Sequence, residues 1–385
     1  MLHALNTKLT RPVKEFNCKP KDRLVKFNNR TLSTMNMKNN SENWREFMEA
    51  LRESFSIKSS DLRQTLGIAP ATLSDLFKKI GVNFVEDEKN VRGQAKNVQS
   101  SDVRKIFELR GYQYPHTAKV ISMMMCKGGV GKTTTTVFVA QRLSAYGAKV
   151  LIIDADSQGN ATSALSLDQY GMSIDEETPV LLDLITGQCE MDDVVLKVSP
   201  NLHLIPSSPA NSTLDGKIRE NFKNTSLALR KHLDPILSKY DFILIDCAPA
   251  LNLTNTAMVA ASKLVIMPVA PDKFSQMGLE QTINEISQIE SDFNLKIEKK
   301  IVFTKFDARE YTSLKYLTDI AESHRDKMFT TMIRTASDLK NAITKKEDLF
   351  SYKKSNAKDD YDNLTKELMG LDKIFDRKQK KEATA

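Results

Sequence analysis

Cysteine is scarce in this chain, and long hydrophobic runs are absent. The four cysteines, Cys18, Cys126, Cys189 and Cys247, stand far apart with no C-x-x-C or Cys/His spacing. They therefore suggest neither a zinc site nor a disulfide framework, and they fit the reducing cytosol. No apolar run reaches the roughly 18 residues of a membrane-spanning helix, and the polar N-terminus does not resemble a signal peptide. We expect a cytoplasmic protein with no membrane partner.

Acidic residues nearly balance basic ones, except at the start of the chain. The 385 residues carry a formal net charge of +7. Residues 1–40 have nine Lys or Arg against two Asp or Glu, whereas residues 41–115 have twelve against eleven and residues 116–385 have 35 against 36. We interpret residues 1–40 as a basic arm with room for a dimerisation helix. Its charge suits nucleic acid, but a solvated extension is an equal alternative.

The stretch "SSDLRQTLGIAPATLSDLFKKIGV", residues 59–82, predicts a helix-turn-helix. Ser60 can cap a first helix, Gly67 can supply the turn, and Pro70 can open a second helix whose apolar residues recur at helical spacing. After Gly81, two β-prone pieces around an acidic bend suit a wing, and a helix then ends at Gly111. Residues 41–115 are therefore predicted to form a winged helix-turn-helix domain.

The second of these helices would act as a recognition helix. Its outward residues include the candidate DNA contacts Thr72, Ser74, Lys78 and Lys79. The near-neutral charge of residues 41–115 leaves a second interpretation open, namely a helical packing domain without DNA contacts.

Beyond residue 116, apolar β-prone runs alternate with helix-compatible stretches. Continuous rather than alternating hydrophobicity predicts strands that are covered on both faces. The fold class is therefore α/β, with a mostly parallel sheet covered by helices and a ligand at the carboxyl ends of the strands. The predicted strands are Val120–Met125, Val150–Ile153, Leu202–Ile205, Phe242–Ile245, Leu264–Val269 and Ile301–Phe303.

Glycine is uncommon, with 14 residues, yet three glycines fall within four positions after the first of these strands. The segment "CKGGVGKTTTT" departs from the phosphate-loop pattern G-x-x-x-x-G-K-[ST] because Cys126 replaces the first glycine. Its glycines can adopt conformations closed to other residues and let backbone N–H groups surround phosphate at a helix N-terminus. The predicted nucleotide-binding residues here are Lys127, Gly128, Gly129, Val130, Gly131, Lys132, Thr133 and Thr134.

Carboxylates follow two further strands. Asp154 and Asp156 lie two residues apart, on the same side of an extended segment. Asp246 ends the run "FILID", as expected of a Walker B residue. A threonine hydroxyl and a carboxylate beside phosphates typically hold Mg²⁺, so Thr133 and Asp246 are the predicted metal site.

These motifs together resemble the deviant Walker A ATPases of the ParA/MinD group. The resemblance covers about residues 117–350 and includes "KGGVGKTTT", "IIDADSQGNAT", "FILIDCAPAL" and "MPVAPD". The helix-turn-helix narrows it to the large ParA proteins. The resemblance implies an ATPase domain at residues 116–355, followed by a C-terminal helix and basic tail at 356–385.

The resemblance also implies site roles. Lys127 would reach the phosphates of a partner subunit in an ATP-bound homodimer, while Lys132 and Thr133 would serve the nucleotide of their own subunit. Asp156 would position the attacking water, beside its switch neighbour Asp154. Lys127, Lys132 and Asp156 are thus the catalytic candidates, with ATP/ADP and Mg²⁺ as cofactors, and the segment 303–307 lies where the family recognises the base.

Partners follow from the same resemblance. ATP-bound ParA dimers bind DNA nonspecifically, can assemble further on it, associate with the nucleoid and are stimulated by a ParB-like centromere-binding protein. The ADP or apo form would repress the operon through the helix-turn-helix. The candidate DNA contacts near the C-terminus are Arg334, Lys340, Lys345 and Lys346. A solvated helix face is the alternative interpretation of these basic residues.

Two other functions of the same fold are considered. A MinD-like membrane ATPase would use the C-terminal stretch with Leu364, Leu368, Leu371 and Phe375. Its interleaved acidic residues favour docking on the domain or on a partner subunit instead. An ATP-switched transcription regulator would bind an operator without turnover stimulated by DNA. Iron–sulfur carriers are disfavoured because no suitable Cys pair follows Asp246.

Overall fold

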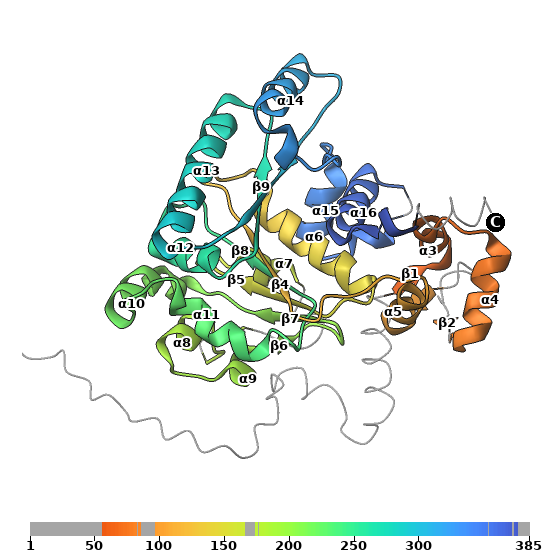
Figure 1. Ribbon diagram of the computed structural model, residues 1–385, viewed down its shortest axis with the longest axis horizontal. Helices are drawn as coiled ribbons and strands as arrows, with labels where there is room; N and C mark the ends of the chain where they lie inside the picture. The colour runs from red at the N-terminus through yellow and green to blue at the C-terminus, as the bar shows by residue number, and fades with distance from the viewer. Residues whose placement is uncertain are drawn as a thin grey trace, which may run out of the picture.

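The chain forms a seven-stranded sheet covered by helices, with a smaller domain beside it (Figure 1). The computed structural model describes residues 56–82, 84–85, 97–165, 174–175, 177–352, 354–371 and 373–375. The predicted basic arm 1–40, the segment 41–55, the tip of the predicted wing and the tail from residue 376 lie outside these residues.

The strands of the large sheet are β4 (Lys119–Met123), β5 (Val150–Asp154), β6 (Leu196–Lys197), β7 (Leu202–Ile205), β8 (Phe242–Asp246), β9 (Leu264–Val269) and β10 (Glu298–Phe303). Their order is β10-β9-β4-β8-β5-β7-β6, and all neighbours are parallel except β6 and β7. The mostly parallel α/β fold is therefore confirmed. Strand β6 was not predicted, because two residues are too few to show a hydrophobic period.

Helices cover both faces of this sheet. One face carries α6 (Lys132–Ala145), α15 (Ser337–Lys345) and α16 (Asn356–Met369), whereas the other carries α8 (Leu181–Thr186), α10 (Leu214–Asn221), α11 (Leu227–Leu233), α12 (Leu253–Ala260) and α13 (Lys273–Phe293). Alternate residues of one strand enter the two cores, as Ile243 and Leu244 do. The remaining helices of this region are α7 (Asn160–Ala164), α9 (Met191–Val194) and α14 (Tyr311–His324).

The smaller domain has the predicted helix-turn-helix. Helix α3 (Ser59–Leu66) ends at Gly67, whose φ of 62° is left-handed, and α4 (Pro70–Ile80) begins with proline at its first position. Strands β1 (Ser56–Lys58), β2 (Phe84–Val85) and β3 (Asn97–Gln99) form a small antiparallel sheet, followed by α5 (Ser100–Leu109). The predicted cap was wrong: α3 begins one residue before Ser60, whose hydroxyl bonds Asp61 instead.

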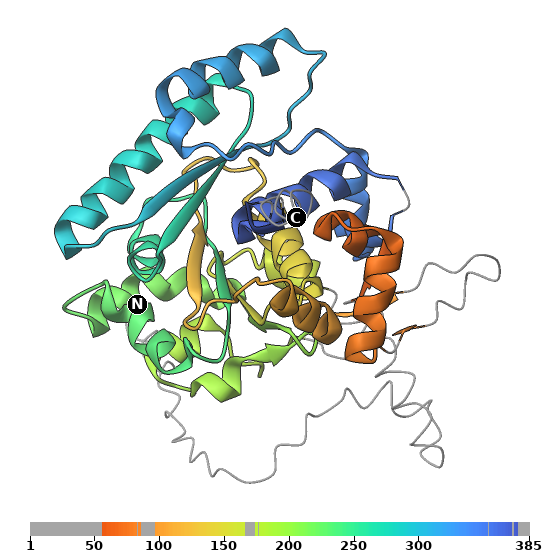
Figure 2. The ribbon, with the colours of Figure 1, turned by 45° about the vertical axis from the view of Figure 1, so that its right-hand side comes forward.

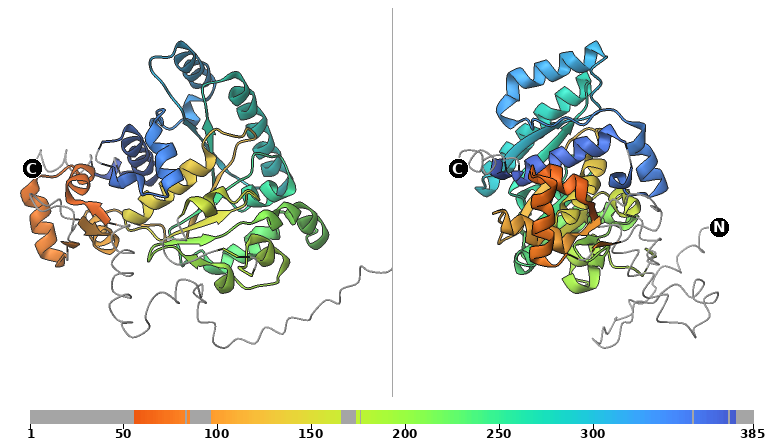
Figure 3. Two further views of the ribbon diagram at one scale, coloured as in Figure 1. Left: turned by 180° about the vertical axis from the view of Figure 1, so that it is seen from behind. Right: turned by 90° about the vertical axis from the view of Figure 1, so that its right-hand side faces the viewer.

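This domain packs directly on the larger domain, beside α6 and α16 (Figures 2 and 3). Thr65 of α3 lies 3.1 Å from the hydroxyl of Tyr146, and Lys358 of α16 pairs with Asp61 at 3.1 Å. Arg104 of α5 donates to Asp241 at 2.7 Å. One apolar core runs through both parts, so the two domains are joined by buried contacts.

The C-terminal helix docks on the protein, as its acidic residues favoured. Leu364, Leu371 and Phe375 are buried in the same core as α6. Helix α16 is capped by Ser355, whose hydroxyl accepts from the backbone N–H of Lys358. None of the described helices is long and apolar enough to cross a membrane.

Candidate functional site

The phosphate loop joins β4 to α6, at the carboxyl end of the sheet. Gly129 and Gly131 have φ of 72° and 97°, in the region that favours glycine. Gly131 is also the N-cap of α6. Gly128 does not have a positive φ, so only Gly129 and Gly131 use the left-handed region here. The helix begins at Lys132, and its first residues line the cavity. The first turn of a helix leaves backbone N–H groups without partners in the helix, and such groups suit phosphate.

Lys132 is buried behind this loop. Its ammonium group donates to the carbonyl oxygen of Lys127 at 3.1 Å. Burial lowers the pKa of Lys132, and the nearby carboxylate of Asp246 partly opposes that shift. An ammonium group held by one carbonyl oxygen keeps two donors available for a phosphate ligand.

The end of β8 and the start of α6 bring the predicted metal residues together. Thr133 Oγ1 donates to Asp246 Oδ2 at 2.6 Å, and the hydroxyl of Thr136 lies 3.3 Å from the other carboxylate oxygen. Burial, together with the negative charge of Asp154, raises the pKa of Asp246 to about 8. A buried carboxylate whose hydrogen-bond donors are neutral hydroxyl groups would be stabilised in its charged form by a cation.

Asp154 and Asp156 leave β5 with different roles. Asp154 is buried and accepts from both the N–H and the hydroxyl of Thr162, at 2.8 and 2.7 Å. Burial raises the pKa of Asp154 to about 6 although these hydrogen bonds lower it. Asp156 lines the cavity and accepts from the N–H of Gln158 at 3.0 Å. Asp154 therefore holds the loop, while Asp156 faces the ligand space.

Sequence reasoning missed two supports of this loop. The hydroxyl of Thr162 also accepts from the N–H of Ser207 at 3.0 Å, and Ser207 Oγ donates to the carbonyl oxygen of Asp156 at 2.6 Å. Ser207 follows β7, so its approach depends on β7 pairing with β5. The only sequence signal was a small polar residue just beyond a strand.

Lys127 lies at the surface beside the loop and is held by α13. Its ammonium group forms an ion pair with Asp272, which also caps α13 by accepting from the N–H of Ser275 at 2.9 Å. The ring of Phe274 lies 5.7 Å from the same ammonium group, and its side chain is 72% exposed. Asp272 belongs to the segment "MPVAPD", but the sequence did not indicate its partner.

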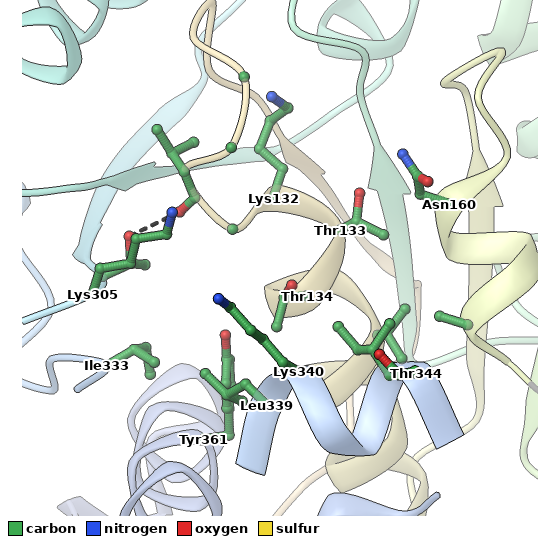
Figure 4. A pocket seen from close by; sticks show the side chains of 18 of the residues that line it. Lys132, Thr133, Thr134, Asn160, Lys305, Ile333, Leu339, Lys340, Thr344 and Tyr361 are labelled. Atoms are coloured by element: carbon green, nitrogen blue, oxygen red, sulfur yellow. Dashed lines mark hydrogen bonds between the residues drawn. The ribbon is translucent and has the colours of Figure 1, made fainter. Parts of the chain in front are cut away.

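The cavity in front of the phosphate loop has a volume of about 900 Å³. Its far wall comes from the end of β10, the segment 333–336, α15 and α16 (Figure 4). Ile333, Leu339, Ile343 and Tyr361 make part of this wall apolar. Thr304 joins the two walls, since its hydroxyl donates to the carbonyl oxygen of Val130 at 2.8 Å. The cavity thus combines a phosphate end with an apolar side that suits a base.

The candidate DNA contacts fall in different places. Arg334, Lys340 and Lys346 line the cavity, whereas Lys345 is exposed outside it. Arg334 is held by Asp360, with Nη2 and Oδ1 2.6 Å apart. On α4, the side chains of Thr72, Ser74, Lys78 and Lys79 are exposed as predicted. Their contact with DNA stays a prediction.

Comparisons with known proteins agree with this site. A family model described as an AAA domain matches residues 118–299. The sporulation initiation inhibitor protein Soj of Bacillus subtilis is 31% identical over 256 residues, which cover 65% of this chain and 98% of that protein. The chromosome partitioning protein ParA of Caulobacter vibrioides is 30% identical over 219 residues, or 56% of this chain and 80% of that protein.

A solved structure extends the comparison. A plasmid partition protein of Borrelia burgdorferi bound to AMPPNP matches with a TM-score of 0.56 and 26% identity, covering 68% of this chain and 99% of that one. The fold and the loop thus define a P-loop NTPase of the α/β type. More narrowly, the chain belongs to the ParA family of partition ATPases.

Proposed function

We propose that this protein is a Mg²⁺-dependent ATPase that hydrolyses ATP to ADP and phosphate, and that its ATP-bound dimer binds DNA during the segregation of a plasmid or chromosome. The observation that carries the proposal is the bond between Thr133 and Asp246 beside the phosphate loop, in a cavity with an apolar side for the base. The relatives named Soj and ParA support the biological setting.

The residues present fit a magnesium ion. Oxygen donors are the ligands that Mg²⁺ prefers, and the metal usually takes several ligands from water and substrate phosphates. The described residues contain no cluster of three or more His, Cys, Asp or Glu side chains suited to a metal. Thr133 would therefore hold the ion directly, with Asp246 acting on it through water. Bound there, Mg²⁺ would neutralise charge on the β- and γ-phosphate oxygens.

Asp156 is proposed to orient the attacking water. Its carboxylate faces the cavity, and the hydrogen bonds of Ser207 and Thr162 hold the loop that carries it. A positioned carboxylate can accept a proton or hold water in line with the γ-phosphate. Lys132 would bind the β- and γ-phosphates of its own subunit.

Lys127 is proposed to act on the nucleotide of a second subunit. Its side chain is not among those that line the cavity, and the exposed ring of Phe274 lies beside it. Met277, also exposed, follows Phe274 by three residues on α13. An exposed apolar pair beside a lysine suits burial against a second copy of the chain. Lys127 must leave Asp272 before it can reach a neighbour, so nucleotide binding and pairing would compete with this ion pair.

DNA is proposed as the surface on which the dimer acts, with a ParB-like protein as the activator of hydrolysis. Lys345 is the exposed basic residue of α15 that remains suited to DNA phosphates, and α4 is suited to an operator. The protein would then associate with the nucleoid and repress its own operon.

The test measures ATP turnover with and without DNA and with the product of the adjacent gene. We expect DNA and that partner to raise turnover together. Lys127→Ala should bind ATP as the wild type does, yet lose dimerisation in ATP by analytical ultracentrifugation. A Lys127→Ala protein that pairs and turns over normally would contradict the proposed role.

An ATP-switched transcription regulator is the second candidate. The observation in its favour is that the helix-turn-helix domain is joined to α6 and α16 by buried contacts. It predicts operator binding that changes with ATP and turnover that does not change with DNA. A MinD-like membrane role is less well supported, because the apolar residues it would need are packed inside the protein.

A further inference from the structure

Two lysines on the far wall of the cavity have no part in the function proposed above. Lys305 follows β10, and Lys340 belongs to α15. Both line the cavity, and among the described residues neither has a carboxylate within ion-pair distance. Figure 4 shows both side chains reaching toward the phosphate loop from the opposite side.

The charge of the cavity calls for a polyanion on this wall. Asp156 is the one acidic residue among those that line it. Arg334 is already neutralised by Asp360, but Lys305 and Lys340 are not. Like charges that share a cavity repel one another, and a bound anion removes that repulsion.

The backbone supports a ligand-binding role for Lys305. Its φ of 54° is left-handed, which is uncommon for a residue with a Cβ atom. Such conformations cluster at ligand clamps, where the surrounding structure maintains them. Here the neighbouring Thr304 fixes the segment by its bond to Val130.

The position of Lys340 selects one part of the nucleotide. Lys132 and Thr133 serve the β- and γ-phosphates and the metal. In Figure 4 the side chain of Lys340 rises from α15 past Thr134, one residue further along α6, and its ammonium end points to the side of the cavity where Lys305 lies. We propose that Lys340, assisted by Lys305, binds the α-phosphate of the nucleotide in its own subunit. This inference rests on the proposed ATPase function.

The same helix provides a matched control. Lys345 lies five residues after Lys340, is exposed and does not line the cavity. The sequence grouped both with the DNA contacts, whereas the inference assigns Lys340 to the nucleotide and leaves Lys345 to DNA. Gln in place of either lysine removes the charge and keeps most of the side-chain length.

The experiment is equilibrium dialysis of the full chain with radiolabelled ATP, competed by unlabelled adenosine, AMP and ADP. Lys340→Gln should weaken the binding affinity for AMP, ADP and ATP by about tenfold each, because a charge-assisted hydrogen bond to phosphate is lost. Adenosine should compete equally in the variant and the wild type. Lys345→Gln should leave the affinities for all four ligands unchanged. Lys305→Gln should lower the affinities for the three phosphorylated ligands, but by less than Lys340→Gln does.

Other outcomes would overturn the inference. Weaker binding of ATP alone would place Lys340 at the γ-phosphate, and weaker adenosine binding would place it at the base or ribose. Unchanged nucleotide affinities with weaker DNA binding would return Lys340 to the DNA surface. A wild-type chain that binds no ATP would instead refute the ATPase proposal. Circular dichroism of each variant checks that the exposed substitutions leave the fold intact.

Discussion

Removing the negative charge of Asp362 should loosen the contact between α6 and α16. Its Oδ1 atom accepts from the guanidinium group of Arg142 and from the hydroxyl of Tyr146 at 2.6 Å, while Oδ2 pairs with Lys366 at 2.7 Å. The side chain of Arg142 is only 2% exposed. Asp362→Asn preserves the shape of the side chain but leaves this guanidinium group buried without a counter-charge.

The expected loss is large for a single substitution. Breaking a buried ion pair by removing one partner costs about 3–5 kcal/mol. At about 2 °C per kcal/mol, the value for larger domains, Tm should fall by roughly 6–10 °C. The matched control is Asp359→Asn on the same helix, because Asp359 is exposed and lies in the first turn of that helix. That control should cost only about 0.3–1 kcal/mol.

The loss of stability caused by Asp362→Asn should also depend on pH, in a direction set by the pKa of Asp362. Burial alone would raise the pKa of Asp362, but the charges of Arg142 and Lys366 outweigh it and lower that pKa. A lowered pKa contributes stability above the unfolded value of about 3.9, and that contribution is lost as pH falls through the folded value. The difference in Tm between wild type and Asp362→Asn should therefore be constant near neutral pH and shrink below about pH 4. Equal Tm values for Asp362→Asn and Asp359→Asn would refute the reasoning.

Three further predictions follow from other contacts. Gly147→Ala should destabilise the joint between the domains, because a Cβ atom there would lie 2.7 Å from Arg104 Cβ at a φ of 82°; differential scanning calorimetry should show a Tm below that of the wild type. Thr162→Val should slow ATP turnover, measured as phosphate release, since a buried Asp154 loses a hydroxyl donor at a cost of about 1–3 kcal/mol. Asp156→Asn should bind ATP with wild-type affinity in equilibrium dialysis yet hydrolyse it at least 100-fold more slowly, on the order of a lost general base.

Local signals account for the parts of the fold that could be predicted. The strands are continuous apolar runs, and the turn between α3 and α4 depends on one left-handed glycine and one proline at a first helical position. The phosphate loop is similarly local, since Gly129 and Gly131 supply the conformations it needs. Each of these features depends on residues that lie within about a dozen positions of one another, so it can be recognised in a single sequence.

The partners of the site residues could not be predicted, because they come from distant segments. Lys127 and Asp272 are 145 residues apart, and Thr133 and Asp246 are 113 apart. Thr133 and Asp246 were nevertheless predicted together, because a phosphate-loop threonine and a Walker B carboxylate typically hold one Mg²⁺ ion between them. No motif paired Asp272 with Lys127 or Ser207 with the loop of Asp156. A polar residue after a strand can cap a helix, stabilise a turn or contact a ligand, so its position alone does not identify its partner.

The basic residues near α15 show that the sequence could not predict which phosphate ligand a lysine contacts. Their charge predicts a phosphate partner but does not say whether that phosphate belongs to DNA or to a nucleotide. Residues five apart on a helix are separated by about 140° around its axis, so Lys340 and Lys345 face different surroundings. The facing direction depends on how α15 packs over the cavity, and this packing is a tertiary property.

Helix α16 changes how the C-terminal region should be divided. The sequence separated it from the ATPase domain at residue 356, yet Tyr361 lines the cavity and lies 3.3 Å from the hydroxyl of Thr135 in α6. The next residue, Asp362, bonds Tyr146, whose hydroxyl also contacts Thr65 of the helix-turn-helix domain. Lys358 joins the same helix to Asp61. A displacement of α16 would therefore disturb contacts to the nucleotide cavity and to α3 at the same time. Truncation of the chain at residue 356 would remove α16 and expose the surfaces of both domains that pack against it.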